Sequence, residues 1–211
     1  MISATLNALA RMGIMFMLIF YFQGALEKDA LIAGIMTIPL AAGMLVVSPL
    51  AGYLGDKYGE TMPATLGLFL NIFGMAGLAL DTAMTTPFWH LALYMTIISV
   101  GAGLFNSPNS SSIMNAAGPR YRGEASGIRS LTTNMGMMLS IAFSMPIVTH
   151  SIPHEVMLAI FSGTQVGMDD KSSLHGFITG LHGVFWFMAA LMAVATVMSY
   201  LRSHRGSRAS A

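Results

Sequence analysis

The sequence predicts an all-α membrane protein, a bundle of six transmembrane helices, and three observations support this prediction. Of the 211 residues, 55% are hydrophobic and only 9% are charged, whereas soluble domains carry about 25% charged residues. The apolar residues are gathered into runs of roughly the 20 residues that a helix needs to cross a bilayer. The charged residues fall between these runs, which indicates that the connections lie in water.

Net charge and cysteine content exclude several classes of function. The chain has a net charge of +1 and no cysteine. A weak net field does not indicate a nucleic-acid partner. Disulfides, thiolate metal sites and cysteine nucleophiles are excluded. We therefore expect the lipid bilayer as the main surroundings of the chain, and no cofactor is indicated.

The six expected spans follow one another within a single bundle, residues 1–201. They comprise residues 5–25, 30–54, 62–81, 88–108, 125–149 and 174–201, and a basic tail follows at 202–211. The fourth span is expected to end near Pro108, where a polar extension begins. Residues 156–168 are apolar but too short to span, so we expect an interfacial or re-entrant segment there.

Basic residues are distributed unevenly between the two ends of the spans. With the N-terminus inside, the cytoplasmic side holds Arg11, Lys57, Arg120, Arg122, Arg129, Arg202, Arg205 and Arg208, and the outer side holds Lys28 and Lys171. The positive-inside rule then predicts that both termini face the cytoplasm. Arg11 is expected near the start of its span, so no charged residue is expected at mid-membrane.

Prolines interrupt several of the spans. Pro39 and Pro49 lie in the second span, Pro108 closes the fourth and Pro146 is late in the fifth. Each proline removes a backbone N–H and disturbs the carbonyl four residues earlier. Such kinks serve either as hinges of a moving transporter or as static bends of a membrane bundle.

The turn after the second span carries the most informative motif. It runs Gly52-Tyr-Leu-Gly-Asp56-Lys57-Tyr-Gly59-Glu60. Glycines suit a tight turn, and a carboxylate there can stabilise a helix N-terminus or pair with a base. The pattern resembles the G-x-L-x-D-[RK]-x-G motif of the major facilitator superfamily.

The resemblance implies a role for each residue of this motif. Asp56 and Lys57 would latch the cytoplasmic gate through charge and helix-dipole contacts, and Gly52 and Gly59 would allow a close approach of the helices. Glu60 departs from the family pattern, which usually has a base there. This departure favours the weaker second copy of the motif, between helices eight and nine.

Further segments resemble, in order, the C-terminal half of the fourteen-span drug/proton antiporter branch of this family. They are Phe20–Gly24, Ala33–Pro39, Gly101–Asn109, Arg122–Gly127 and Asn134–Gly136. The resemblance implies one half of a secondary active transporter in a prokaryotic plasma membrane, not an enzyme. It implies proton-coupled multidrug or small-molecule export by alternating access. The missing N-terminal half would come from the same gene, a split gene or a second copy of the chain.

Polar residues within the spans are candidates for the substrate cavity, because polar groups in a membrane are costly and often functional. They are Tyr21, Gln23, Asn106, Asn109, Thr133 and Asn134. The resemblance places their spans around the central cavity and the third and sixth spans outside it. The alternative is that these side chains hydrogen-bond between helices, which is the role we expect for Asn71.

Histidines do not predict a metal site. His150 and His154 have helical spacing beside Glu155, but Pro153 between them disfavours a regular helix. His175 and His182 share a helical face, which suits either proton sensing or packing.

Other functions for a six-span chain stay open. A half-size homodimeric transporter and a noncatalytic partner subunit are the main alternatives. A channel is weakly suggested by Asn106-Ser-Pro108, and an intramembrane serine protease would have to use Ser126, which lacks a Gly-x-Ser-Gly setting.

Overall fold

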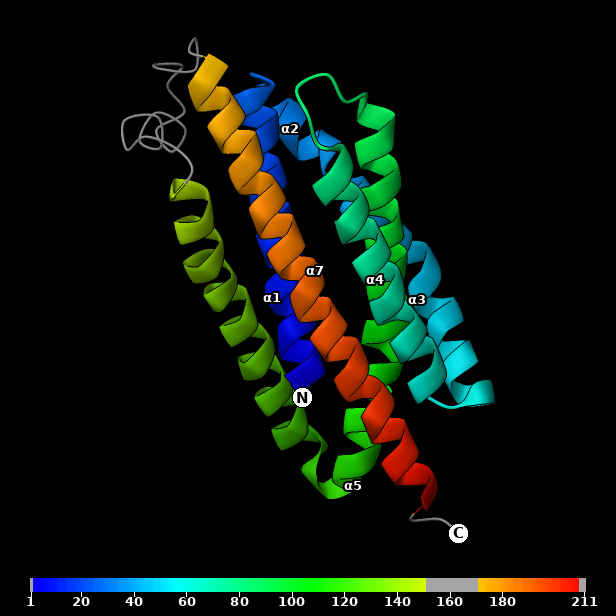
Figure 1. Cartoon of the computed structure of the whole chain (residues 1–211). Helices are drawn as coiled ribbons and strands as arrows, with labels where there is room; N and C mark the ends of the chain where they lie inside the picture. The colour runs from blue at the N-terminus through cyan, green and yellow to red at the C-terminus, as the bar shows by residue number, and fades with distance from the viewer. Residues whose placement is uncertain (1, 151–170, 209–211) are drawn as a thin grey trace.

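The computed structural model describes residues 2–150 and 171–208, which form long helices packed side by side (Figure 1). The helical segments are α1 (Ile2–Phe20), the π-helical turn η1 (Tyr21–Ala25), α2 (Ala30–Met36), α3 (Pro39–Tyr58), α4 (Thr61–Asp81), α5 (Phe88–Thr149) and α7 (Lys171–Arg208). The predicted all-helical fold is confirmed.

The 62-residue helix α5 is two arms joined by a sharp turn. Gly118 has φ 69° and ψ 169°, a backbone conformation that is essentially restricted to glycine. Pro119 follows and suits the first turn of the next arm. Five helices in the described residues are long and apolar enough to cross a membrane. Counting α5 as its two arms, which Figure 1 shows meeting at one end, gives six arms, in agreement with the prediction.

The second predicted span is not one continuous helix. It is divided into α2 and α3 at Thr37 and Ile38, directly before Pro39. Pro39 cannot donate to the carbonyl of Ile35, and the N–H of Ile38 donates to that oxygen instead, at 3.1 Å. The break therefore leaves this carbonyl hydrogen-bonded inside an apolar segment.

The fourth predicted span differs at its end. The helix continues beyond Pro108 as far as Gly118. A Cβ on Gly55 of α3 would lie 3.4 Å from the Cβ of Pro108, so the glycine leaves room for the proline ring. Where the membrane-spanning part of this arm stops remains a prediction. The expected interfacial segment at 156–168 lies outside the described residues.

The core lies where the arms of α5 pack against the other helices. The first arm lies between α3 and α4, and the second arm lies along α1. Glycines allow these approaches: Gly103 faces Met44 and Val47 of α3, and Gly136 faces Ala8 of α1. The largest buried side chains belong mostly to α1, α4, α5 and α7 and include Leu18, Phe22, Leu68, Phe105 and Phe185.

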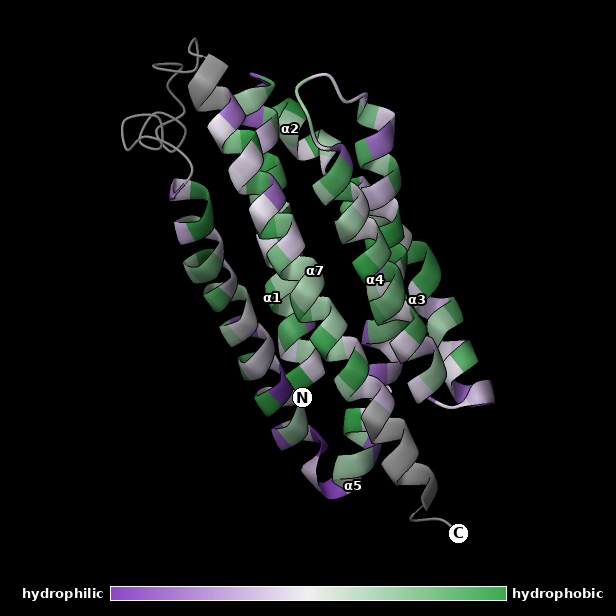
Figure 2. Cartoon of the chain, viewed as in Figure 1, coloured by the Kyte–Doolittle hydropathy of each residue, from purple (hydrophilic) through white to green (hydrophobic). Residues whose placement is uncertain are grey.

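The α2–α3 segment presents an uncovered apolar face. Only 17% of its most apolar stretch is buried, against 50% for α1 and α4. Leu45 and Val46 are each 78% exposed. Figure 2 shows hydrophobic residues along the middle of the helices and hydrophilic ones toward the turn of α5. Helix α1 begins and helix α7 ends toward the end of the bundle that carries this turn (Figure 1).

Candidate functional site

The α3–α4 turn brings its motif glycines against α5. A Cβ on Gly52 would lie 3.4 Å from Ser107 Oγ, an ordinary van der Waals contact. Gly52 and Gly55 thus face Ser107 and Pro108 of α5. The close approach expected at Gly52 stays a prediction, because a Cβ would be accommodated at this position.

Asp56 and Lys57 lie exposed in the last turn of α3. The Lys57 ammonium lies 5.3 Å from the ring centroid of its neighbour Tyr58. In the described part of the chain, no ion pair joins Asp56 or Lys57 to another helix. Both side chains are therefore free to meet a surface outside this bundle.

Gly59 serves the turn rather than a close approach. Its φ of 85° and ψ of 149° fall in a region that favours glycine. Among the described residues, no atom would lie within 4 Å of a Cβ at this position. The backbone conformation is sufficient to explain the glycine within this bundle, and the close approach expected at Gly59 stays a prediction.

Glu60, the departure from the family pattern, ties the turn to α5. Its Oε1 accepts a hydrogen bond from Asn115 Nδ2 at 2.9 Å. This contact joins the start of α4 to the end of the first arm of α5. The sequence marked Glu60 as unusual but gave no sign of its partner 55 residues away.

Three asparagines from three helices form a chain of amides in the core. Asn71 Nδ2 of α4 donates to Asn7 Oδ1 of α1 at 3.2 Å, and Asn7 Nδ2 donates to Asn106 Oδ1 of α5 at 3.4 Å. Asn7 and Asn71 are buried, and so is Asn109, one turn beyond Asn106. Asn71 has the packing role expected of it. Asn106, a substrate-cavity candidate, contributes to the same interhelical contact.

Tyr21 is also held within the bundle. Its side chain is buried in η1, and its hydroxyl donates to the carbonyl of Ala83 at 2.7 Å. Nearby, His182 Nε2 of α7 lies 2.6 Å from the carbonyl oxygen of Thr82. These contacts fix α1 and α7 to the α4–α5 connection, at the end opposite the α5 turn (Figure 1).

The remaining candidates are spread over the surface. Gln23 and Asn134 are exposed, and Thr133 Oγ1 donates to the carbonyl of Arg129 in its own helix at 2.9 Å. The structure does not bring the six candidates together around one cavity. A role for Gln23, Thr133 or Asn134 in substrate binding stays a prediction.

Arg11 lies further inside its helix than the span bounds expected from the sequence. It is the tenth of the 24 residues of the first span, Ile2–Ala25, roughly 15 Å from the start of the helix. Arg11 therefore lies nearer the middle of this helix than the span bounds expected from the sequence imply, and its depth in the membrane stays a prediction. The signal was present in the sequence, because the residues before Arg11 are largely apolar and extend the helix backwards to Ile2.

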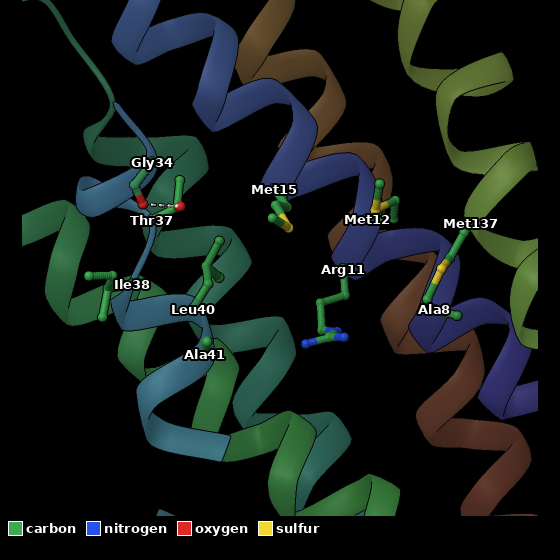
Figure 3. Close-up of a pocket in the computed structure, with 10 residues that line it drawn as sticks. All are labelled: Ala8, Arg11, Met12, Met15, Gly34, Thr37, Ile38, Leu40, Ala41 and Met137. Atoms are coloured by element: carbon green, nitrogen blue, oxygen red, sulfur yellow. Dashed lines mark hydrogen bonds between the residues drawn. The ribbon is translucent and has the colours of Figure 1, made fainter. Parts of the chain in front are cut away.

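Arg11 lies at the common wall of two adjoining hollows. One has a volume of about 250 Å³ and is lined by α1, α2, α3 and α5, including Met12, Met15 and Met137. The other has a volume of about 570 Å³ and is lined by α3 residues together with Arg11. Figure 3 shows the Arg11 guanidinium pointing from α1 into the space beside Leu40 and Ala41.

Metal ligands do not gather in the described residues, where no group of three His, Cys, Asp or Glu side chains lies close enough to hold an ion. His154 and Glu155 lie outside the described residues. His175 is exposed on α7.

Comparison with known proteins gives a consistent result. The sequence profile of the Major Facilitator Superfamily matches residues 1–211. The Riboflavin transporter RibZ of Clostridioides difficile strain 630 is 25% identical over 191 residues, which cover 90% of this chain and 39% of RibZ. The Drug efflux pump JefA of Mycobacterium tuberculosis strain H37Rv is 30% identical over 123 residues, 58% of this chain and 24% of the pump.

A third relative points the same way. The Methylenomycin A resistance protein of Streptomyces coelicolor strain A3(2) is 27% identical over 143 residues, 67% of this chain and 30% of that protein. The chain thus spans well under half the length of each of these three relatives.

Proposed function

The chain belongs to the Major Facilitator Superfamily, and we propose that it is the C-terminal half of a transporter that exports small amphipathic molecules. It is an integral membrane protein of a transporter family whose members are not enzymes. In the proposed mechanism, this half rocks against an N-terminal half around a site near the bilayer midplane. The names of the efflux pump JefA and of the methylenomycin resistance protein support export as the direction.

The uncovered face of α2 and α3 carries this proposal. It is the least buried of the long apolar segments, and two hollows beside Arg11 lie along it. In a complete transporter, such a face would meet the other half and the hollows would face the central cavity. The coverage of only 39% of RibZ supports a missing half.

The motif turn would act as the latch between the halves. Asp56 and Lys57 are exposed at the end of α3, where they could meet helix ends of the N-terminal half. Favourable charge at helix ends is worth about 0.3–1 kcal/mol per contact. We propose that these contacts close the cytoplasmic side, and that Gly52 allows a close approach of the helices there.

Proton coupling is part of the proposal, and the coupling carboxylate is assigned to the N-terminal half. The described acidic residues of this chain lie toward the ends of its helices or in their connections, as with Asp29, Asp56 and Asp81. We further propose a prokaryotic plasma membrane with both termini in the cytoplasm. The grouping of Lys57, Arg120 and Arg122 at the end of the bundle where α1 begins and α7 ends supports this orientation.

The test begins with the DNA upstream of the Met1 codon and continues with transport. If a reading frame with six to eight further spans is found there, the two halves are expressed together and separately in bacteria that lack their own drug exporters. We expect energised efflux of ethidium from cells with both halves and none from cells with either half alone. Efflux by this chain alone would favour a homodimer, and no efflux from any strain would favour a partner subunit.

The same assay tests the latch. Asp56→Asn should lower the rate of ethidium efflux about two- to fivefold while the amount of protein in the membrane stays constant, because the carboxylate charge is lost and the shape is kept. Glu124→Gln is the matched control, since Glu124 is an exposed acid near the α5 turn and outside the motif. Equal rates for both variants would remove Asp56 from the gate.

A further inference from the structure

We infer that Arg11 binds the anionic group of the transported molecule, so that this transporter takes amphipathic organic anions. This inference rests on the function proposed above, and it names the class of substrate for the same cavity. Four observations each contribute a step: the position of Arg11, the lack of an acidic partner among the described residues, the hollows beside Arg11 and the chemistry of their walls.

The first step is the position of an unneutralised cation. A charged side chain at the middle of a membrane helix is costly and is retained mainly where it pairs or functions. Arg11 lies near the middle of its span, and no Asp or Glu is among the described residues that line the hollows around it. Its one polar contact among the described side chains is from Nη1 to Met44 Sδ at 3.9 Å.

The second step is the number of donors that this contact leaves available. A guanidinium has five N–H donors and no acceptor, whereas a thioether sulfur is a weak acceptor. Met44 therefore satisfies at most a small part of the donor capacity of Arg11. A carboxylate or sulfonate would satisfy two donors at once through parallel hydrogen bonds and would neutralise the charge.

The third step is room for an apolar body next to the charge. The two hollows share Arg11 and Ala41, and their volumes are about 250 and 570 Å³. The larger one alone is in the range of small-molecule sites, about 300–1,000 Å³. Figure 3 shows Met12, Met15 and Met137 around Arg11, with Ile38 and Leu40 on the facing segment. Methionine side chains adapt to ligands of different shape.

The fourth step excludes other anion-binding groups in the walls. Thr37 Oγ1 donates to the carbonyl of Gly34 at 2.7 Å, and Ser48 Oγ donates to the carbonyl of Met44 at 2.6 Å. Both hydroxyl protons are used by the backbone, so these groups offer only lone pairs to a ligand. Arg11 is thus the group in these walls that can hold a negative charge.

The test uses two probes that differ in one group. 8-Anilinonaphthalene-1-sulfonate is an amphipathic anion, and N-phenyl-1-naphthylamine has the same ring system without the sulfonate. The purified 211-residue chain is placed in nanodiscs of zwitterionic lipid, and binding of each probe is followed by fluorescence after subtraction of the signal from empty nanodiscs. We expect Arg11→Met to weaken binding of the sulfonate about tenfold or more and binding of the neutral probe less than twofold.

Two further variants make the result specific. Arg11→Lys keeps the charge but loses the planar pair of donors, so it should retain part of the preference for the sulfonate. Arg120→Gln removes an exposed arginine near the α5 turn and should leave both affinities unchanged. Unchanged binding of the neutral probe also reports that each variant is folded.

The location is checked by methyl NMR of the methionines. The sulfonate should shift the methyl signals of Met15 and Met137, which line the hollow, and leave that of Met84 in the α4–α5 connection unchanged. Equal effects of Arg11→Met on both probes, or shifts confined to distant methionines, would overturn the inference. This outcome is distinct from a failure of the efflux assay, since binding is measured on this chain without transport.

Discussion

The chain of amides formed by Asn7, Asn71 and Asn106 illustrates what a single polar residue does within this bundle. Asn7 is the central member, because it accepts from Asn71 and donates to Asn106. Its partners lie 64 and 99 residues away along the chain. An amide in an apolar bundle is stabilised only if a partner on another helix is in reach. These bonds therefore favour one register of α1 against α4 and α5.

The substrate role and the packing role of Asn106 were both open from the sequence, for a physical reason. A polar residue in a span must be satisfied either by another helix or by a ligand, and both choices give the same local sequence. The partner, Asn7, precedes Arg11 on α1. Which face of this segment packs against α5 depends on the packing of the helices and cannot be read from the sequence.

We predict that Asn7→Ala destabilises the bundle by about 1 kcal/mol, the usual scale for an interhelical hydrogen bond in a membrane protein. The variant leaves Asn71 Nδ2 and Asn106 Oδ1 without this partner. The measurement is the midpoint of thermal unfolding in detergent, followed by the fluorescence of Trp89 and Trp186. Asn134→Ala, at an exposed position, is the control, and equal midpoints for both variants would show that the amide chain contributes nothing.

At the scale of elements, the sequence predicted the number and order of the helices better than their ends. The length of each apolar run is imposed by the bilayer, so the runs are strong signals. A proline is a weaker signal for where a helix ends, because its effect on the helix depends on what packs against it. Pro39 begins a helix, whereas Pro108 stays inside one beside Gly55. The break in α5 lies instead at Gly118, before Pro119, a glycine–proline pair that is typical of a turn.

The helix that carries Arg11 begins earlier than expected for a related reason. Counting charge-free residues starts a span after a charge, but a helix can begin before it when the preceding residues are apolar. Residues Ile2–Ala10 extend α1 backwards, which moves Arg11 from the edge of the span to its middle. Contacts between α1 and α5 stabilise this extension. Counting charge-free residues along the sequence does not reveal such contacts.

The contact between α1 and the second arm of α5 depends on Gly136. A Cβ at this position would lie 2.6 Å from the carbonyl oxygen of Thr5, a backbone atom that cannot move without α1. We predict that Gly136→Ala destabilises the protein by about 1–3 kcal/mol, the usual cost of overpacking. Gly127→Ala in the same arm is the matched control, because no described atom would lie within 4 Å of its Cβ.

The two glycine variants are compared by thermal unfolding under identical conditions. Gly127→Ala should leave the midpoint unchanged or raise it, since alanine is the better helix former. Gly136→Ala should lower it, and it should lower the affinity for amphipathic probes as well, because Met137 follows directly in the wall of the hollow. If Gly136→Ala had the same unfolding midpoint as Gly127→Ala, α1 and the second arm of α5 could move apart at little cost in free energy.

For the whole molecule, hydropathy predicted a bundle but not which of its faces meets protein. Lipid tails are about as apolar as leucine side chains, so a face toward lipid and a face toward another apolar surface have similar sequences. The exposed residues Leu45 and Val46 fit either. Arg11 and the hollows beside α3 support the proposed contact with another half, because a charged side chain does not suit contact with lipid alone.

The orientation in the membrane can be measured because the chain contains no cysteine, so that each introduced cysteine is unique. Tyr58 at the end of α3 is 60% exposed, and Thr85 is exposed in the connection at the far end of α4. The 21 residues of α4 separate these positions by about 32 Å. With both termini in the cytoplasm, Thr85→Cys should react with a membrane-impermeant maleimide in intact spheroplasts, and Tyr58→Cys should react only after lysis.

The basic residues near Tyr58 are the physical cause of this expectation, and Tyr58→Cys leaves all of them in place. Lys57, Arg120 and Arg122 are exposed at that end of the bundle, and such residues are retained on the cytoplasmic side. If Tyr58→Cys reacted in intact spheroplasts and Thr85→Cys only after lysis, the orientation would be the opposite one. The Asp56 motif would then lie outside, where it could not close a cytoplasmic gate. Labelling of both positions in intact spheroplasts would contradict a membrane-spanning α4. Adding two arginines beside Thr85 should weaken or reverse the difference in labelling between the two positions. This variant tests whether the distribution of basic residues sets the orientation.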